Sequence, residues 1–334
     1  MLYLDFHHHT ILVRSNESEL LKKLHDEFHY FVVDNIPSPE VTIDLNLEAP
    51  PELPSMVASK ILEQATVYHL GSRQYIDYSQ EAQTIWDRYD SKVEIFSLNP
   101  DRLYELAFLA IHSLLGQHLD RDGISRLHAV AISIAATNAI IMLPSKGGKS
   151  TLLEKFLENP EVKIISDDMP LCDIQGRIFP FPSKISLNAL PTSGPLSDLN
   201  WNEFIRTSYP PKWTASLSQL KDRIATHPEN NQNILVAGFR LSSGQSLLLE
   251  VSKWKMIKPM MEHMIMGLGL PQVIEMFLKF KITDLLKLPY HAAIRSICAF
   301  QLVRKARCYY IYLGPDKSYN AQVLMDVVYE NSKK

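Results

Sequence analysis

Hydrophobic and polar residues alternate over two stretches in the first third of the chain, 5–14 and 41–47, which predicts β-strands there. Short stretches rich in tyrosine and valine, at 66–69, 74–78 and 92–96, are further candidates for strands. Two other stretches, 18–28 and 103–115, repeat apolar residues at helical spacing and are expected to form amphipathic helices. Residues 1–120 are therefore expected to bury a small α+β core of their own.

A charged stretch, residues 118–123, separates this part from a second part with a different pattern. Residues 128–136 and 139–143 are apolar and predict a β-hairpin that turns at Thr137-Asn138. A second hairpin is expected over residues 233–251. The other elements predicted in this part are helices at 257–266, 272–280, 292–305 and 321–330 and a strand at 308–313. We therefore expect a second domain over residues 121–334, with domain 1–120 handling a substrate or partner.

A short loop rich in glycine and lysine follows the first predicted hairpin, in the sequence Pro-Ser-Lys-Gly-Gly-Lys-Ser-Thr. Its end matches the phosphate-binding pattern G-x-x-x-x-G-K-[ST], but Leu143 stands in place of the first glycine. The backbone N–H groups of such a loop and the dipole of the following helix attract phosphate. The predicted phosphate-binding residues are Ser145, Lys146, Gly147, Gly148, Lys149, Ser150 and Thr151.

Two adjacent carboxylates, Asp167 and Asp168, follow a buried strand predicted at residues 162–165. Successive side chains of a strand point to opposite sides, so one carboxylate can face a metal ion and the other an acceptor hydroxyl. Lys149 can reach the terminal phosphates of a nucleotide, and Ser150 can ligate Mg²⁺. A serine hydroxyl attacks a phosphoryl group well only when a base accepts its proton. The order of strand, loop, helix, strand and carboxylates therefore predicts phosphoryl transfer.

Composition and charge exclude several other classes of protein. The chain has 334 residues and a net charge of −3, which disfavours nucleic-acid binding through overall charge. No apolar run is as long as a membrane span requires, and the N-terminus lacks the pattern of a secretory signal. The three cysteines form no CxxC pair, so a cytoplasmic protein without disulfides is expected.

The stretch from Arg126 to Ile185 resembles the catalytic domain of bacterial HPr kinase/phosphorylase. The likeness rests on His128-Ala-Val, the apolar hairpin, the Pro-Ser-Lys-Gly-Gly-Lys-Ser loop and the later Asp-Asp pair. It is especially similar to the diverged HPr-kinase-like proteins found in gene clusters for peptide natural products such as lasso peptides. The resemblance implies a phosphoenolpyruvate-carboxykinase-like nucleotide-binding domain. An antiparallel hairpin leading into the loop agrees with that fold.

The resemblance also implies roles for individual residues. His128 is expected near the phosphates, and Lys149 and Ser150 are expected to bind phosphate and Mg²⁺. Asp167 and Asp168 are expected to supply the base and a carboxylate on the metal side, with their division of labour left open; we assign the metal to Ser150 and Asp168. The implied activity is a Mg²⁺- and ATP-dependent kinase that phosphorylates a serine of a peptide or small protein. ATP stands here for any nucleoside triphosphate, and a homo-oligomer stays open.

Some features depart from the family pattern and keep two alternatives open. Besides Leu143, the loop carries Lys146 where the family has a small residue, and a later Gly-Arg signature is absent. A catalytically inactive nucleotide-binding or scaffold protein is the first alternative. A nucleotidase or phosphorylase that releases phosphate is the second.

A few residues outside the loop are weaker candidates. Arg240 lies on a predicted strand and is expected either to reach a phosphate or to be a surface charge. Lys184 is a candidate for the acceptor site. The histidine run at positions 7–9 is interpreted as part of a strand, because a metal site needs ligands that converge on one point. The methionines between 256 and 266 are interpreted as helix core or as a soft docking face.

Overall fold

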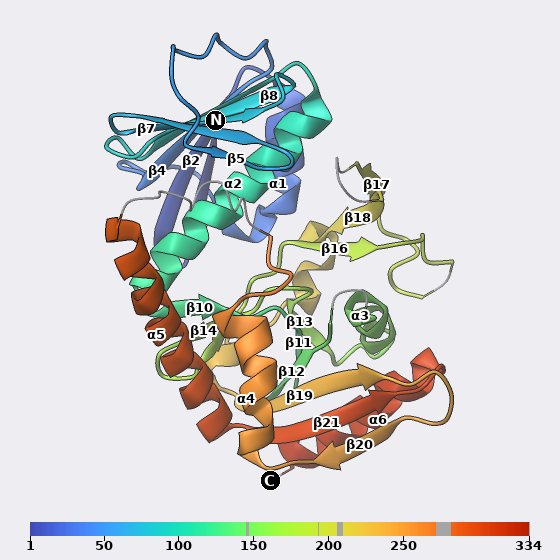
Figure 1. The fold of residues 1–334 in the computed structure, drawn as a ribbon. Helices are drawn as coiled ribbons and strands as arrows, with labels where there is room; N and C mark the ends of the chain where they lie inside the picture. The colour runs from blue at the N-terminus through green and yellow to red at the C-terminus, as the bar shows by residue number, and fades with distance from the viewer. Residues whose placement is uncertain (145–146, 193, 206–209, 272–281, 334) are drawn as a thin grey trace. The chain divides into compact units, whose positions relative to one another are not determined.

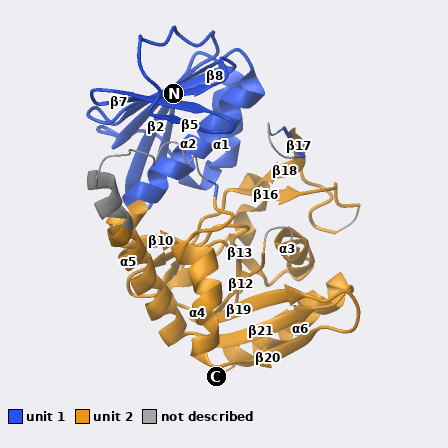
Figure 2. Cartoon of the chain, in the orientation of Figure 1, with its two compact units in different colours: residues 1–118, 204–211, 271–288 blue, residues 119–203, 212–270, 289–334 orange. Residues whose placement is uncertain are grey.

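The computed structural model describes residues 1–144, 147–192, 194–205, 210–271 and 282–333. The chain divides into two compact units, drawn in Figure 1 and coloured separately in Figure 2. Unit 1 comprises residues 1–118, 204–211 and 271–288, and unit 2 comprises residues 119–203, 212–270 and 289–334. Both contain sheets and helices, so the chain is of the α+β class. Segments 204–211 and 271–288 lie inside the expected second domain, yet they belong to unit 1.

Unit 1 is built around a nine-stranded sheet in the order β3-β1-β2-β4-β9-β8-β7-β6-β5. Its strands are β1 (Leu2–Phe6), β2 (His9–Ser15), β3 (Val32–Val33), β4 (Val41–Asn46), β5 (Lys60–Ile61), β6 (Thr66–Leu70), β7 (Arg73–Tyr78), β8 (Ala82–Asp87) and β9 (Lys92–Ser97). Helix α1 (Ser18–Glu27), the 3₁₀ turn η1 (His29–Phe31) and helix α2 (Pro100–Arg121) complete the unit's main elements. The strands predicted at 41–47, 66–69, 74–78 and 92–96 are confirmed as β4, β6, β7 and β9, whereas β3, β5 and β8 were not expected.

The segment expected as one strand over residues 5–14 forms parts of two strands. His7 and His8 turn the chain between β1 and β2 with φ values of 55° and 77°. This is the left-handed region that tight hairpin turns require. His9 begins β2 and is buried, so the three histidines do not share one environment. The interpretation of the run as a single strand was therefore wrong.

The centre of unit 2 is a six-stranded sheet in the order β13-β11-β12-β19-β21-β20. Its strands are β11 (Val130–Ile134), β12 (Thr137–Met142), β13 (Lys163–Ser166), β19 (Gln232–Arg240), β20 (Leu247–Glu250) and β21 (Arg307–Leu313). Strands β12, β19 and β21 are parallel neighbours, and the other contacts are antiparallel. The first predicted hairpin, β11–β12, is confirmed. It turns at Ala135 and Ala136 rather than at Thr137-Asn138, because Asn138 is buried and donates to the carbonyl of Pro228.

The second predicted hairpin, over residues 233–251, was wrong. Strands β19 and β20 exist, but β21 lies between them and forms hydrogen bonds with both. Strands β19 and β20 are therefore not paired with each other, because a strand near the C-terminus of the chain lies between them.

Helices cover both faces of the central sheet of unit 2 (Figure 1). Helix α3 (Lys149–Leu157) and helix α6 (Lys317–Ser332) enclose one hydrophobic cluster with the sheet. The other face is covered by α4 (Ile257–Met260), the π-helical η5 (Met261–Ile265) and residues from Pro289 onward of α5 (Ile282–Lys305). Met256, Met260 and Met264 are buried there, which confirms the prediction of helix core for these three, whereas Met261 and Met266 are exposed. The helix expected at 272–280 lies outside the described residues.

Shorter elements surround this sheet. A three-stranded sheet contains β10 (Ile124–Arg126), β14 (Leu171–Asp173) and β15 (Ile178–Phe179). A second contains β16 (Lys184–Leu187), β17 (Trp201–Phe204) and β18 (Lys212–Ser216). The 3₁₀ turns are η2 (Leu217–Arg223), η3 (Pro228–Asn230) and η4 (Lys253–Met256). Strand β16 follows the aspartate pair in the chain and becomes part of the candidate site.

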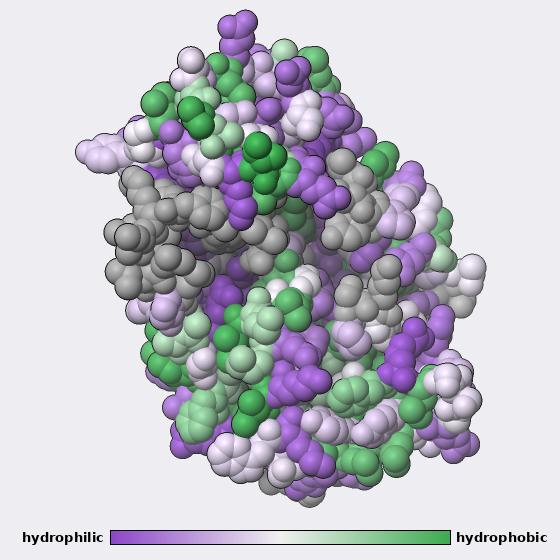
Figure 3. All heavy atoms as spheres, viewed as in Figure 1, coloured by the Kyte–Doolittle hydropathy of each residue, from purple (hydrophilic) through white to green (hydrophobic). Residues whose placement is uncertain are grey.

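The surface drawn in Figure 3 mixes hydrophobic with hydrophilic residues, as is normal for folded proteins. The cysteines Cys172, Cys298 and Cys308 are buried and carry free thiols. In the part of the chain that the structure describes, no helix has the length and apolar character needed to cross a membrane.

Candidate functional site

Three strand ends, those of β11, β12 and β13, meet at one edge of the central sheet of unit 2. Strand β11 runs antiparallel to both β12 and β13, so its amino end lies beside their carboxyl ends. His128 precedes β11, the lysine-containing loop follows β12, and Asp167 and Asp168 follow β13. The N–H group of Ala129 donates to the carbonyl of Asp168 at 3.1 Å, which extends the pairing past the end of β13. The topology therefore gathers residues that are distant in the sequence.

The loop turns into helix α3 through two glycines. Gly148 caps the helix with φ 98°, a conformation that favours glycine. At Gly147 a Cβ atom would lie 2.7 Å from the carbonyl oxygen of Pro144, so a side chain there would not fit without movement. No acidic residue occupies the first turn of α3, and its leading N–H groups have no acceptor within the helix. This end of α3 is thus suited to bind an anion. Ser145 and Lys146, also predicted to bind phosphate, lie outside the described residues.

Leu143, which stands in place of the first glycine of the motif, is fully buried below the loop. Its side chain belongs to the hydrophobic cluster between the sheet and helices α3 and α6. A Cβ added to Gly238 would lie 2.1 Å from Leu143 Cδ2, so the leucine uses the space that Gly238 leaves on β19. The packing of Leu143 thus depends on a glycine of the neighbouring strand.

Lys149, His128 and Asp168 form a compact polar triangle. The Lys149 Nζ atom lies 2.8 Å from His128 Nε2 and 3.5 Å from Asp168 Oδ1. His128 Nε2 lies 3.2 Å from the same Asp168 oxygen. Lys149 and His128 thus both contact the Asp168 carboxylate, and the ammonium group of Lys149 offsets its negative charge.

Two neighbours from η5 and the following turn hold His128 in place. The backbone N–H of His128 donates to the carbonyl of His263 at 2.9 Å, and His263 Nδ1 lies 3.1 Å from the carbonyl of His128. Gly269 has φ 91°, and a Cβ there would lie 2.2 Å from His128 Cε1. The imidazole of His128 therefore packs directly on the backbone of Gly269. Burial and the nearby His128 and Lys149 charges lower the pKa of His263 to about 4.

Asp167 points away from the triangle, toward Ser150. Its Oδ2 atom lies 3.5 Å from Ser150 Oγ and accepts the backbone N–H of Ser186 on β16 at 3.3 Å. Oδ1 is buried and has no hydrogen-bond partner among the described residues. Burial and the neighbouring charge of Asp168 raise the pKa of Asp167 to about 7, against the opposing effects of Ser186, Lys149 and Lys212. A buried carboxylate oxygen that accepts no hydrogen bond, close to a hydroxyl group, is suited to bind a cation.

Asp168 has a different environment, although it is the next residue. Its side chain keeps 48% of its surface exposed. Loss of solvent raises its pKa, but the hydrogen bond and charge of His128 and the charges of Lys149 and Lys212 outweigh that effect and lower it. The two carboxylates thus contact different partners, as the alternation along a strand predicts. The metal assignment paired Ser150 with Asp168, whereas Asp167 is the carboxylate next to Ser150.

The other predicted residues lie around this cluster. Thr151 is in the first turn of α3 and half-buried. Arg240 is exposed near the same sheet edge, two residues beyond Gly238, and no contact with the cluster is found for it among the described residues. Lys184 is buried at the start of β16, the strand that supplies the N–H group of Ser186.

Sequence reasoning missed three residues that shape the site: Lys212, His263 and Gly269. Lys212 begins β18 and influences both aspartates through its charge. None of the three stands in a recognisable motif, and each is brought in by pairing or packing of distant segments. For these three residues, the one local signal of an unusual backbone in the sequence was the pair Gly267 and Gly269, which are two positions apart.

A separate surface pocket of about 200 Å³ lies at the opposite ends of the parallel strands. It is lined by the first residues of β19 and β21 and by Arg177, Lys305 and Asn331. None of the predicted site residues belongs to it. Sites of open parallel sheets form outside the carboxyl ends of the strands, which is where the polar cluster lies.

Two comparisons with known proteins were negative. No model of a protein family matches the chain, and no curated protein matches it.

Proposed function

We propose that the chain is a Mg²⁺- and nucleotide-dependent kinase that phosphorylates a serine hydroxyl of a peptide or small protein. One observation carries the proposal: Lys149, at the amino end of a glycine-capped helix, lies within 3.5 Å of Asp168 and 2.8 Å of His128. A phosphate-binding end and a carboxylate open to solvent are thus adjacent. The antiparallel β11–β12 hairpin before the loop also supports an HPr-kinase-like nucleotide-binding fold for unit 2.

Lys149 and the amino end of α3 are suited to the phosphates. In the absence of nucleotide, Asp168 provides the negative charge near Lys149. A bound phosphoryl group can take over the interaction with the ammonium and with the N–H groups of the first turn. His128, which contacts Lys149, can then turn an N–H donor toward a phosphate oxygen.

Ser150 and Asp167 are suited to hold Mg²⁺. Magnesium prefers oxygen ligands and is usually held by one or two protein groups together with phosphate oxygens and waters. The Ser150 hydroxyl and Asp167 Oδ2 are 3.5 Å apart, and Asp167 Oδ1 has no hydrogen-bond partner among the described residues. When bound, the ion would neutralise charge on the transferring phosphoryl group.

Asp168 is suited to be the base. Its half-exposed carboxylate can meet an acceptor that arrives from solvent, whereas Asp167 is buried. In the transfer, the bond between the γ-phosphorus and the bridging oxygen breaks and a bond to the serine oxygen forms. The serine proton passes to Asp168, and the nucleoside diphosphate leaves. The lowered pKa of Asp168 keeps its carboxylate ionised, so that it can accept the serine proton.

The first test separates binding from transfer. We expect ATP with Mg²⁺ to bind wild type in calorimetry, and Lys149→Ala to weaken that binding. Lys155→Ala is the matched control, since Lys155 lies on the same helix but pairs with Glu158. Asp168→Asn should keep nucleotide binding and lose transfer of labelled γ-phosphate to serine-containing peptides by about 10²–10⁴-fold.

Three outcomes would count against the kinase. Absence of ATP binding at millimolar nucleotide would exclude a nucleotide site and favour a scaffold. Equal binding by wild type and Lys149→Ala would move the site elsewhere. Release of inorganic phosphate without labelled peptide, dependent on Asp168, would indicate a nucleotidase.

A further inference from the structure

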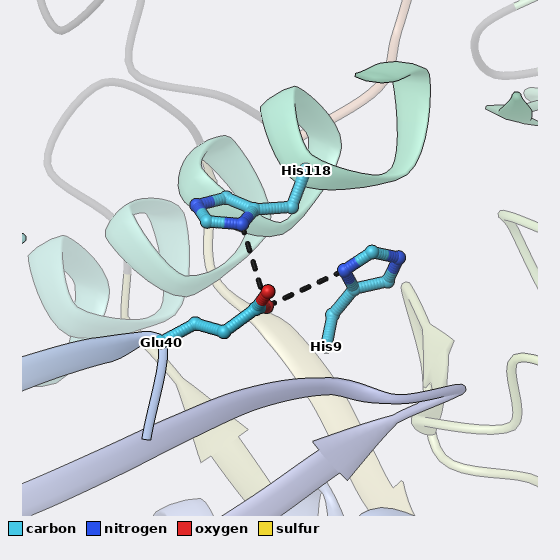
Figure 4. Close-up of side chains that lie close together, drawn as sticks. All are labelled: His9, Glu40 and His118. Carbon is cyan, nitrogen blue, oxygen red and sulfur yellow. Dashed lines mark ion pairs between the residues drawn. The ribbon is translucent and has the colours of Figure 1, made fainter. Parts of the chain in front are cut away.

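Unit 1 contains a second polar cluster, formed by His9, Glu40 and His118 (Figure 4). These residues come from the start of β2, the segment before β4 and the last turns of α2. One ligand atom of each lies within 4.8 Å of the others. In the part of the chain that the structure describes, no other group of three histidine, cysteine or acidic residues comes this close together.

The backbone fixes the positions of all three side chains. Strands β2 and β4 are parallel with Ile11 opposite Val41, so the preceding residues His9 and Glu40 lie near one another. The N–H of Glu40 donates to the Thr10 hydroxyl at 3.1 Å. His118 reaches the carboxylate from α2, and its ring meets that of His9 nearly edge-on, with centroids 6.1 Å apart. The cluster thus does not depend on the conformation of a free loop.

The distances suit a shared metal ion better than hydrogen bonds. Both imidazoles direct Nδ1 at the same carboxylate oxygen, Glu40 Oε2, and each is 3.4 Å from it. Hydrogen bonds between nitrogen and a carboxylate are typically about 2.7–3.2 Å long. Ligand atoms about 2.0–2.2 Å from a tetrahedral ion lie roughly 3.3–3.5 Å apart. Two of the three edges of a metal site therefore already have the required length.

The ligand types and their exposure favour zinc. Two imidazole nitrogens and one carboxylate oxygen match zinc, whose sites with three protein ligands keep a fourth position for water. His9 is buried, whereas the side chains of His118 and Glu40 are 20% and 36% exposed, so solvent can supply that water.

We propose that His9, Glu40 and His118 bind a zinc ion that fastens the end of α2 to the sheet of unit 1. His118 is the last residue of this unit before the chain passes into unit 2. The zinc ion would therefore bind where the first segment of unit 1, residues 1–118, ends. The proposal is independent of the kinase proposal, since the ligands are all in unit 1 and the kinase residues are all in unit 2.

Calorimetry with ZnCl₂ alone tests the site, on full-length protein freed of metal by a chelator. Wild type should bind one zinc ion per chain at this site. His9→Gln, Glu40→Gln and His118→Gln should each weaken that binding by at least about tenfold, the lower end of what even outer-shell changes cost. His8→Gln is the matched control, because His8 is exposed in the turn next to His9. His128→Gln tests whether zinc also binds at the candidate kinase site, because only zinc bound there would be lost in this variant.

Co²⁺ tests the same site without any substitution. Bound to wild type in place of zinc, it should give the visible bands of four-coordinate cobalt with nitrogen and oxygen ligands, and it should be displaced by zinc. The proposal is overturned if wild type binds no zinc at sub-millimolar concentration. It is also overturned if tight binding survives all three ligand substitutions, or if bound Co²⁺ shows six-coordinate spectra only.

Discussion

His263 shows how one residue can support a site without touching a substrate. Its ring lies 5.6 Å from the ring of His128, and its backbone and Nδ1 hold the main chain of His128. Burial, together with the charges on His128 and Lys149, keeps its pKa near 4, against the opposing effect of Asp168. The side chain is therefore neutral in the folded protein under conditions in which an unfolded chain would protonate it.

This difference predicts a loss of stability in acid. Between pH 6.5 and about 4 the unfolded chain binds a proton at His263 that the folded chain does not, so the free energy of unfolding falls as the pH falls through that range. At pH 5 the loss amounts to about 2 kcal/mol relative to pH 7. His263→Gln should remove this part of the pH dependence, because glutamine keeps an N–H donor for the carbonyl of His128 and has no charge to gain.

Urea unfolding at pH 7 and pH 5 measures the effect. His227→Gln is the control, since His227 is largely exposed. If wild type and His263→Gln lost the same stability between the two pH values, His263 would not be held neutral by the fold.

At the residue scale, the sequence predicted the part of the site that is local in the chain. Gly148, Lys149 and Ser150 stand in one motif, and Asp167 and Asp168 follow one strand, so their types and spacing were sufficient. The pairing of Ser150 with Asp167 was not predictable, because it depends on which side of the sheet edge each carboxylate faces. His263, Gly269 and Lys212 are distant in the chain, and packing alone brings them to the site.

At the element scale, Leu143 at the end of β12 fits against Gly238 of β19. The two strands are parallel neighbours, and the leucine methyl group occupies the place of a Cβ atom on the glycine. Leu143→Ala should destabilise the protein by about 2–5 kcal/mol through a lost contact and a cavity. Gly238→Ala should cost about 1–3 kcal/mol, since the new methyl group displaces Leu143.

The double variant separates this fit from two independent defects. The methyl group that Gly238→Ala adds can enter the space that Leu143→Ala vacates, so the double variant should cost at least about 1 kcal/mol less than the two single variants together. Urea unfolding of all four proteins gives the coupling free energy. Costs that add to within about 0.5 kcal/mol would show that the two residues do not share this space.

Element types were easier to predict than their partners. Alternation identified β4 and helical spacing identified α1, because these patterns are local. The hairpin expected over 233–251 failed because its strands are separated by β21, whose position is determined by hydrogen bonds and packing with distant residues. The β1–β2 turn was missed because the segment contains no glycine, and positive φ values such as those of His7 and His8 are uncommon in other residues.

At the scale of the whole molecule, the two proposals concern different units. The candidate kinase residues Lys149, Asp167 and Asp168 are in unit 2, and the candidate zinc ligands are in unit 1. A ligand stabilises the folded state that holds it by RT ln(1 + [L]/Kd), which is about 2.7 kcal/mol at 100 times the dissociation constant. Each ligand should therefore protect first the unit in which it binds.

Hydrogen–deuterium exchange distinguishes the two effects in one protein. Zinc should slow exchange at amides of β2 and the end of α2, and ATP with Mg²⁺ should slow exchange at amides of α3 and β13. At 100 times Kd, amides that exchange through unfolding of the bound unit should slow by about 100-fold. His118→Gln should abolish only the zinc effect, and Lys149→Ala only the nucleotide effect. Protection of α3 by zinc that disappears in His118→Gln would mean that the units unfold together. Zinc protection of α3 that persists in His118→Gln would instead place the ion at the kinase cluster, so each substitution assigns its ligand to one site.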